Sequence, residues 1–204
     1  REWQDPDFGQ AWPADMVRRL DVLIEEAFDK AQSSDLVGLP TPWIRLKRRL
    51  RRDLRAWIGL DDQLRSDGWK PLQPEVGFAD LQVGLPDATV LGLRGSIDRV
   101  DVDAAGNLRV LDYKTGKSSR YRGLKAADPT KAGKYLQLPI YALAAQREFG
   151  SRQVSAYYWF ISGSEHGRTI GYEVTPEVLQ EALGVIQVAV DGHRRGLFPP
   201  RPKA

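Results

Sequence analysis

The two stretches that decide the fold are GSIDRVD at residues 95–101 and VLDYKTG at residues 110–116. Both are rich in Val, Ile and Leu, and with their flanking residues they predict strands near residues 89–102 and 108–113. The intervening DAAGN at residues 103–107 is typical of a flexible turn. We therefore expect the two strands to pair as a hairpin.

Two carboxylates and an ammonium group converge if this hairpin forms. Asp112 and Lys114 share one face of their strand and Tyr113 takes the other, because side chains alternate along a strand. Pairing brings Asp98 toward the same edge. Two acids in one place repel each other unless a cation lies between them, which indicates a divalent metal and phosphodiester hydrolysis. The alternative is a solvated strand end with an ordinary salt bridge.

Composition limits what this site can hold. The 204 residues include no Cys and two His, which excludes disulfides, thiolate zinc sites and an all-histidine metal site. Oxygen ligands favour hard ions, so Mg²⁺ or Mn²⁺ is expected. There is no apolar run of the roughly 20 residues that a membrane span needs, and the N-terminus lacks a signal-peptide pattern. We expect a soluble, cytoplasmic protein with no membrane partner.

The rest of the chain alternates helix and strand around the hairpin, which predicts one α/β domain with a mixed sheet. Apolar periodicity predicts a helix over residues 16–31 and a second that opens with Thr41 as N-cap and runs to about Arg65. The remaining expected elements are a strand near 75–78, a polar loop over 115–133, a helix over 134–149, strands over 154–162 and 168–174, and a last helix from Thr175 to about Arg195.

The second helix carries seven Lys and Arg between residues 45 and 55. Clustered cations bind the phosphate backbone of nucleic acids by releasing counterions, and Arg48 and Arg52 are candidates for DNA contact. A solvated helix face is an equally good interpretation, because Asp53, Asp61 and Asp62 are near enough in sequence to pair with some of these cations.

The two deciding stretches, together with QLPIY at residues 137–141, resemble the RecB-like branch of the PD-(D/E)XK nuclease superfamily. The three blocks occur in the order and with the spacing typical of that branch, and the resemblance covers about residues 70–200. It implies a restriction-endonuclease-like mixed β-sheet flanked by helices. Residues 1–69 would then be a helical N-terminal region packed on a nuclease core of residues 70–204.

The resemblance also implies a role for each matched residue. Asp98 and Asp112 would be metal ligands together with the backbone carbonyl of Tyr113, and Lys114 would be the catalytic lysine. Gln137 and Tyr141 match the family's Q-x-x-x-Y motif and would contact DNA from one helix face. Glu75 matches an acidic position that precedes the hairpin in this branch.

The implied function is a metal-dependent deoxyribonuclease of exonuclease type, acting in recombination and repair beside a helicase domain or subunit, on single- or double-stranded DNA. The alternatives are a non-catalytic DNA-binding or scaffolding module with the same fold, and a nuclease of RNA or of both nucleic acids. The sequence departs from the family by lacking an upstream metal-binding histidine. Relatives often carry an iron–sulfur cluster whose cysteines follow a segment like GLFPP at residues 196–200. We expect the chain to be part of a longer protein that could hold such a cluster.

Overall fold

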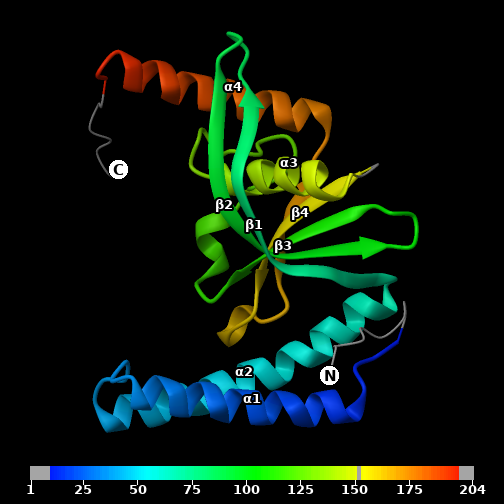
Figure 1. Ribbon diagram of the computed structural model, residues 1–204, viewed down its shortest axis with the longest axis vertical. Coiled ribbons are helices and arrows are strands. Elements are labelled where there is room, and N and C mark those ends of the chain that lie inside the picture. Colours follow the sequence, from blue (N-terminus) through cyan, green and yellow to red (C-terminus); the bar gives the residue numbers. More distant parts are fainter. Residues whose placement is uncertain (1–9, 151–152, 198–204) are drawn as a thin grey trace.

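A five-stranded mixed sheet lies at the centre of the computed structural model, which describes residues 10–150 and 153–197 (Figure 1). The β1–β2, β2–β3 and β4–β5 pairs are antiparallel, whereas β3 and β4 are parallel and are joined through helix α3 (Gln137–Phe149). The predicted α/β class with a mixed sheet is confirmed. The strands lie in chain order as β1 (Trp69–Gly84), β2 (Val90–Asp103), β3 (Leu108–Lys114), β4 (Val154–Phe160) and β5 (Thr169–Glu173).

Strand β1 is sixteen residues long, so the prediction of a strand only near residues 75–78 was too short. Pro71 and Pro74 interrupt the expected strand pattern in the sequence. They are tolerated because β1 is an edge strand, where a missing N–H breaks no ladder on the outer side. The register to β2 shifts after Pro71 and again after Phe78, which also weakens a simple alternating pattern.

One face of the sheet forms the main core with α3 and α4 (Pro176–Arg194). The last helix starts where predicted, and Thr175 caps it by accepting a hydrogen bond from the Val178 N–H at 3.4 Å. Helix α3 begins at Gln137 rather than at residue 134. Residues 131–134 form a turn, in which residues 131–133 have φ of 49°, 54° and 82°, and the helix starts after it.

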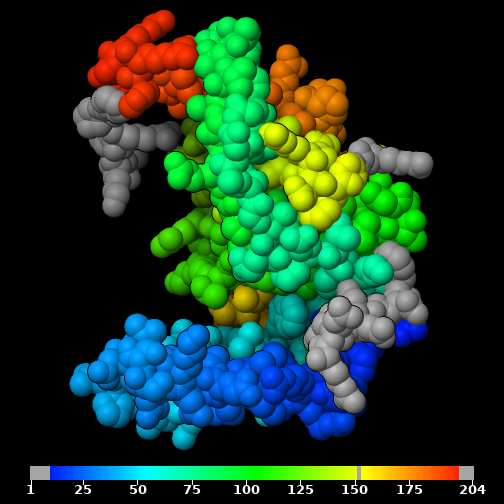
Figure 2. Space-filling view, viewed as in Figure 1, coloured from blue at the N-terminus to red at the C-terminus, as the bar shows by residue number. Residues whose placement is uncertain are grey.

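The opposite face of the sheet is covered by a pair of long helices, α1 (Ala14–Ser33) and α2 (Pro40–Ser66). Trp57 of α2 packs on the sheet against Tyr113 and Trp159, with ring centroids 6.4 and 6.2 Å away. Helix α2 starts with Pro40 at its first position and no side-chain cap, so the prediction of Thr41 as N-cap was wrong. Figure 2 shows the two helices as an elongated layer below the sheet, and this layer extends past the sheet on one side.

The hairpin of β1 and β2 reaches away from α2 toward α4 (Figure 1). At its tip, Gln187 and Arg194 of α4 donate to the Asp87 carboxylate at 3.0 and 3.4 Å. These contacts attach the far end of the hairpin to the last helix. Within the described residues, no helix is long and apolar enough to cross a membrane.

Candidate functional site

Three of the predicted site residues meet where β2 and β3 separate. The β2–β3 ladder ends with Arg99 opposite Leu111, so Asp98 and Asp112 would form the next pair of the register. The ammonium group of Lys114 forms an ion pair with Asp112 Oδ2. The strand hairpin thus brings both carboxylates and the lysine to one opening in the sheet, as the sequence predicted.

The backbone of Tyr113 contributes to the same opening. Its N–H donates to Asp98 Oδ2 at 2.8 Å. The Lys114 carbonyl accepts from the Ile161 N–H at 3.0 Å on the β4 side, and backbone groups alternate in direction along a strand. The Tyr113 carbonyl oxygen therefore points to the β2 side, toward Asp98.

The carboxyl group of Asp112 is nearly enclosed, because only 2% of the residue is exposed. Its Oδ2 is paired with the Lys114 ammonium. Burial raises the pKa of Asp112; Lys114 opposes this change and the charge of Asp98 adds to it. A buried carboxylate is costly unless a cation lies beside it, and Lys114 supplies a cation here.

Helix α3 closes the opening from the core side of the sheet. Gln137 Oε1 accepts from Lys114 Nζ at 3.4 Å, and Gln137 Nε2 donates to the Tyr141 hydroxyl at 2.9 Å. The two α3 residues lie one turn apart on one face, as predicted. Burial raises the pKa of Tyr141, which keeps this phenol protonated and able to donate a hydrogen bond. The chain therefore places Gln137 and Tyr141 beside the acidic pair.

These donors fit a hard divalent cation only in part. Two carboxylates and a backbone carbonyl are oxygen ligands of the kind that Mg²⁺ and Mn²⁺ accept. The described residues contain no group of three or more His, Cys, Asp and Glu side chains that could hold a metal. A cation at Asp98 and Asp112 would thus complete its coordination with the Tyr113 carbonyl, water or substrate oxygens, which suits Mg²⁺.

Glu75 lies next to this cluster along the sheet. Pro74 pairs with Arg99 and Val76 with Ile97, so Glu75 stands opposite Asp98 in the β1–β2 register. Its φ of 48° lies in the left-handed region, and its exposed carboxylate accepts from Ser96 Oγ at 3.4 Å. The position predicted from the family motif is close to the site in register, but its carboxylate is turned to Ser96.

A buried ion network supports the site from the opposite face of the sheet. The Arg99 guanidinium, 4% exposed, bridges the carboxylates of Asp61 on α2 and Asp101 on β2. Burial works against this charge, but Asp101, the Tyr113 phenol and Asp61 outweigh it and raise the pKa of Arg99. Asp61 also accepts from Arg65 Nε at 3.2 Å. Sequence analysis missed this role and treated Asp61 as a partner for the basic stretch; the four-residue spacing to Arg65 was the available signal.

The basic stretch of α2 divides into two sets. Arg51 and Arg55 pair with Glu25 and Asp21 of α1, the latter pair at 2.9 Å. Neither Asp61 nor Asp62 supplies these partners, so that part of the solvated-face interpretation was wrong. Arg52 pairs with Asp53 at 3.1 Å while 68% of its side chain stays exposed. The remaining exposed arginines form no ion pair with any described residue; these are Arg45, Arg48 and Arg49.

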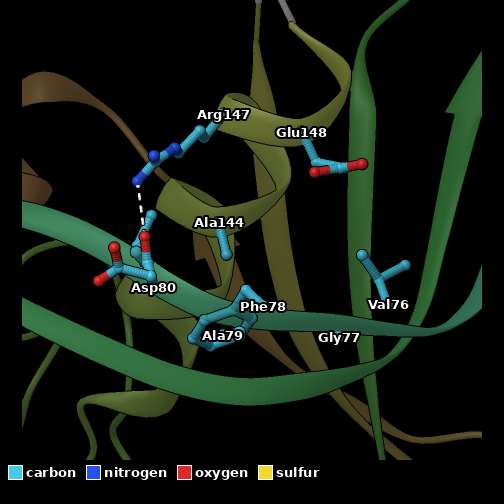
Figure 3. A pocket seen from close by; sticks show the side chains of 9 residues that line it. Val76, Gly77, Phe78, Ala79, Asp80, Ala144, Arg147 and Glu148 are labelled. Carbon is cyan, nitrogen blue, oxygen red and sulfur yellow. Dashed lines mark hydrogen bonds between the residues drawn. The ribbon is translucent and has the colours of Figure 1, made fainter.

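A hollow of about 220 Å³ lies between β1 and α3 on the outer side of the cluster (Figure 3). Val76, Phe78 and Ala144 line it, and Arg147 closes one end by donating to the Asp80 carbonyl at 3.0 Å. The Phe78 ring also meets Tyr141 edge to face at 6.1 Å between ring centroids. The hollow thus adjoins the site without sharing its acidic pair.

A model of the PD-(D/E)XK nuclease superfamily matches residues 7–204. The chain is 33% identical over 152 residues to an ATP-dependent helicase/deoxyribonuclease subunit from Symbiobacterium thermophilum, which covers 67% of this chain and 12% of that protein. The protein of the same name from Desulforudis audaxviator is 32% identical over 172 residues, covering 74% of this chain and 14% of that protein. The chain therefore spans only 12–14% of the length of these two relatives. Of the GLFPP segment, residues 198–200 lie outside the described residues.

Proposed function

Because the chain belongs to the PD-(D/E)XK nuclease superfamily, in its RecB-like branch, we propose that it is the nuclease domain of a longer helicase–nuclease protein. It hydrolyses DNA phosphodiesters with a divalent metal, in recombination and repair. The observation that carries the proposal is the convergence of Asp98, Asp112 and Lys114 at the point where β2 and β3 part.

Asp98 and Asp112 would hold the metal, with the Tyr113 carbonyl as a further ligand. When bound there, Mg²⁺ or Mn²⁺ would lower the pKa of water and neutralise charge on the phosphate. The Asp98 carboxylate is held in place by the Tyr113 N–H at 2.8 Å, so this ligand is oriented before substrate arrives. The buried carboxylate of Asp112 is paired with the Lys114 ammonium, so this second ligand is also held at the site.

Lys114 acts on the attacking water and on the phosphate. Its ammonium group lies between Asp112 and the Gln137 side chain, and 23% of its side chain is exposed. A cation at this place stabilises negative charge that develops on phosphorus and orients the water through hydrogen bonds. Gln137 holds Lys114 toward the site and takes its own orientation from Tyr141.

DNA is held by two groups of residues. Gln137 and Tyr141 present amide and hydroxyl groups to the strand next to the scissile phosphate. Arg48 and Arg52 of α2 contact phosphates farther along, since their side chains are exposed and Arg48 has no ion pair with a described residue. The name shared by the relatives, helicase/deoxyribonuclease, favours DNA over RNA and a helicase as the partner.

Cleavage of end-labelled linear and of circular single- and double-stranded DNA tests the proposal. The wild-type chain is assayed with Mg²⁺, Mn²⁺ or a chelator, beside Asp112→Asn and Lys114→Ala. We expect metal-dependent release of short products from linear DNA only, which identifies exonuclease cutting, and loss of cleavage by at least about a hundredfold in both variants. Asp80→Asn is the matched control, because this exposed Asp lies outside the cluster.

Three outcomes would contradict parts of the proposal. Full activity of the Asp112→Asn variant contradicts the assignment of Asp112 to the catalytic site. Cutting of circles excludes a strict exonuclease. DNA binding without cleavage under any metal, in a protein that contains the whole helicase–nuclease, identifies a non-catalytic module instead.

A further inference from the structure

The segment between β3 and α3 is strongly basic, with six Lys and Arg and one Asp over residues 117–134. That Asp, Asp128, pairs with Lys131 at 3.6 Å. The other five cations are exposed and form no ion pair with any described residue; they are Lys117, Arg120, Arg122, Lys125 and Lys134. Like charges gathered on a surface repel each other. Lys117 has an acid near it, Glu165, but this acid also pairs with Arg168 at 3.3 Å, so the segment keeps an excess of positive charge that an anion can neutralise.

A second set of cations lies on α2. Arg45, Arg48, Arg49 and Arg52 fall within about 100° of each other around the helix, at about 3.6 residues per turn. The arginines that face α1 are neutralised by acids of that helix, whereas this arc keeps most of its charge. The arc therefore adds a second positive surface.

The loop between β4 and β5 joins the two surfaces. It contains the short 3-10 helix η2 (Gly163–Glu165), and the basic segment contains another, η1 (Ser118–Tyr121). Ser118 Oγ donates to Glu165 Oε2 at 2.6 Å, and His166 Nε2 lies 3.0 Å from the Asp53 carbonyl oxygen of α2. Asp53 directly follows Arg52, so η1 and the arginine arc stand on either side of η2. In Figure 1 this loop lies between the sheet and α2.

The basic segment also starts at the catalytic residues. Thr115 directly follows Lys114, and its carbonyl accepts from Ser162 Oγ at 2.9 Å, next to η2. The surfaces thus run from Lys114 over η1 and across η2 to α2. Apart from Lys114, Arg48 and Arg52, the cations along this path have no part in the proposed hydrolysis.

We propose that the basic segment and the arginine arc form one continuous track for the phosphate backbone of a single DNA strand whose scissile phosphate lies at Lys114. The inference rests on the proposed nuclease function and extends it. A single strand is favoured because Asp112 is 2% exposed, so a phosphate must enter a recess, and a flexible backbone can bend into it. A duplex is stiff and carries its phosphates on a wide cylinder, which cannot follow the same path.

The track is tested by the salt dependence of DNA binding, which needs no cleavage. Fluorescence anisotropy of a labelled oligothymidylate of about 20 nucleotides is measured in chelator between about 50 and 300 mM NaCl. The variants are Lys117→Gln/Arg120→Gln/Arg122→Gln on the segment and Arg45→Gln/Arg48→Gln/Arg49→Gln on α2. The control removes the same charge from exposed cations outside both surfaces, as Arg18→Gln/Arg94→Gln/Arg195→Gln.

Each track variant is expected to lower the slope of log K against log salt by about 2, because each single-strand phosphate contact contributes about 0.7. The control should keep the wild-type slope. All substituted side chains are exposed, and thermal melting of each variant checks that the fold is intact. An unchanged slope in the segment variant overturns the track, and so does an equal loss of slope in the control.

A second arm separates single strands from duplex. A duplex of about 20 base pairs is titrated under the same conditions, and its slope is expected to change by less than about 1 in the segment variant. A duplex slope that falls as much as the single-strand slope refutes the single-strand assignment. Failure of the nuclease proposal would appear elsewhere, as absence of cleavage by the wild-type protein under every metal, with its binding slopes unaffected.

Discussion

Replacing Asp61 by Ala is expected to lower the free energy of unfolding far more than an ordinary surface change. Asp61 is fully buried, although it carries a charge. Its carboxylate is bound by Arg99, by Arg65 Nε at 3.2 Å and by the Trp12 indole N–H at 2.6 Å. The substitution leaves two buried guanidinium groups with one fewer anion, on the sheet face behind the catalytic strands.

The magnitude follows from this geometry. Removing one partner of a buried ion pair costs about 3–5 kcal/mol, because the remaining charge stays desolvated. A matched control is Asp21→Ala, since Asp21 pairs with Arg55 at 2.9 Å but both side chains are about half exposed, at 47% and 63%. Screening by water limits that pair to about 0–1 kcal/mol. Both substitutions remove a carboxylate that pairs with Arg, but Asp61 is buried and also binds Arg65 and Trp12, whereas Asp21 is half exposed and pairs with Arg55.

Urea denaturation followed by tryptophan fluorescence and by circular dichroism measures both losses. Arg99 is adjacent in sequence to Asp98, and the Tyr113 hydroxyl lies 3.5 Å from Arg99 Nη1. Asp61→Ala should therefore also weaken Mn²⁺ binding in the fraction that remains folded. Equal destabilisation by the two substitutions would refute the argument that burial determines how much the ion network stabilises the fold.

Three further expectations follow from the structure. Gly171→Ala on β5 should destabilise the sheet by about 1–3 kcal/mol or prevent folding, because a Cβ there would lie 2.0 Å from a β4 carbonyl oxygen. In the control, Gly184→Ala on α4, the added Cβ meets nothing within 4 Å, so this variant should be neutral or stabilising in thermal melts. Hydrogen bonds from Thr89 lower the pKa of Asp87. The stability that the Asp87 carboxylate adds to the hairpin tip is therefore present above about pH 4 and is lost as the pH falls through the lowered pKa. A chemical-shift titration that gives an ordinary pKa for Asp87 contradicts this. Mn²⁺ should raise the melting temperature of the wild-type chain and not that of Asp112→Ala, and an equal rise in both would exclude binding at the acidic pair.

The candidate site could be predicted from sequence because its residues lie close together in the chain. Asp98 and Asp112 are joined by a short turn, and alternation along one strand sets the faces of Asp112 and Lys114. Gln137 and Tyr141 share a helix face for a similar local reason. Most of this cluster can therefore be predicted from short-range geometry. The family motifs predict in addition that Gln137 and Tyr141 of α3 lie near the β3 residues.

Two other features were missed, one for a tertiary reason and one for a local reason. The length of β1 follows from its place at the edge of the sheet, which makes Pro71 and Pro74 harmless. Helix α3 starts after a turn over residues 131–134, whose positive φ values at Lys131 and Ala132 are not revealed by residue preferences. The place of β1 in the sheet overrode local propensity, whereas the turn before α3 is a local backbone feature.

The sequence by itself determined the α/β class, the hairpin and the acidic pair with its lysine, because periodicity and turn residues act over a few positions. Only the tertiary structure decided which charges remain unpaired. Helix α1 neutralises one side of α2 and leaves its other arginines exposed, while Asp61 is taken into the interior to bind Arg99. Charge pairing depends on distance in space and on exclusion of water, and neither quantity is encoded by spacing along the chain.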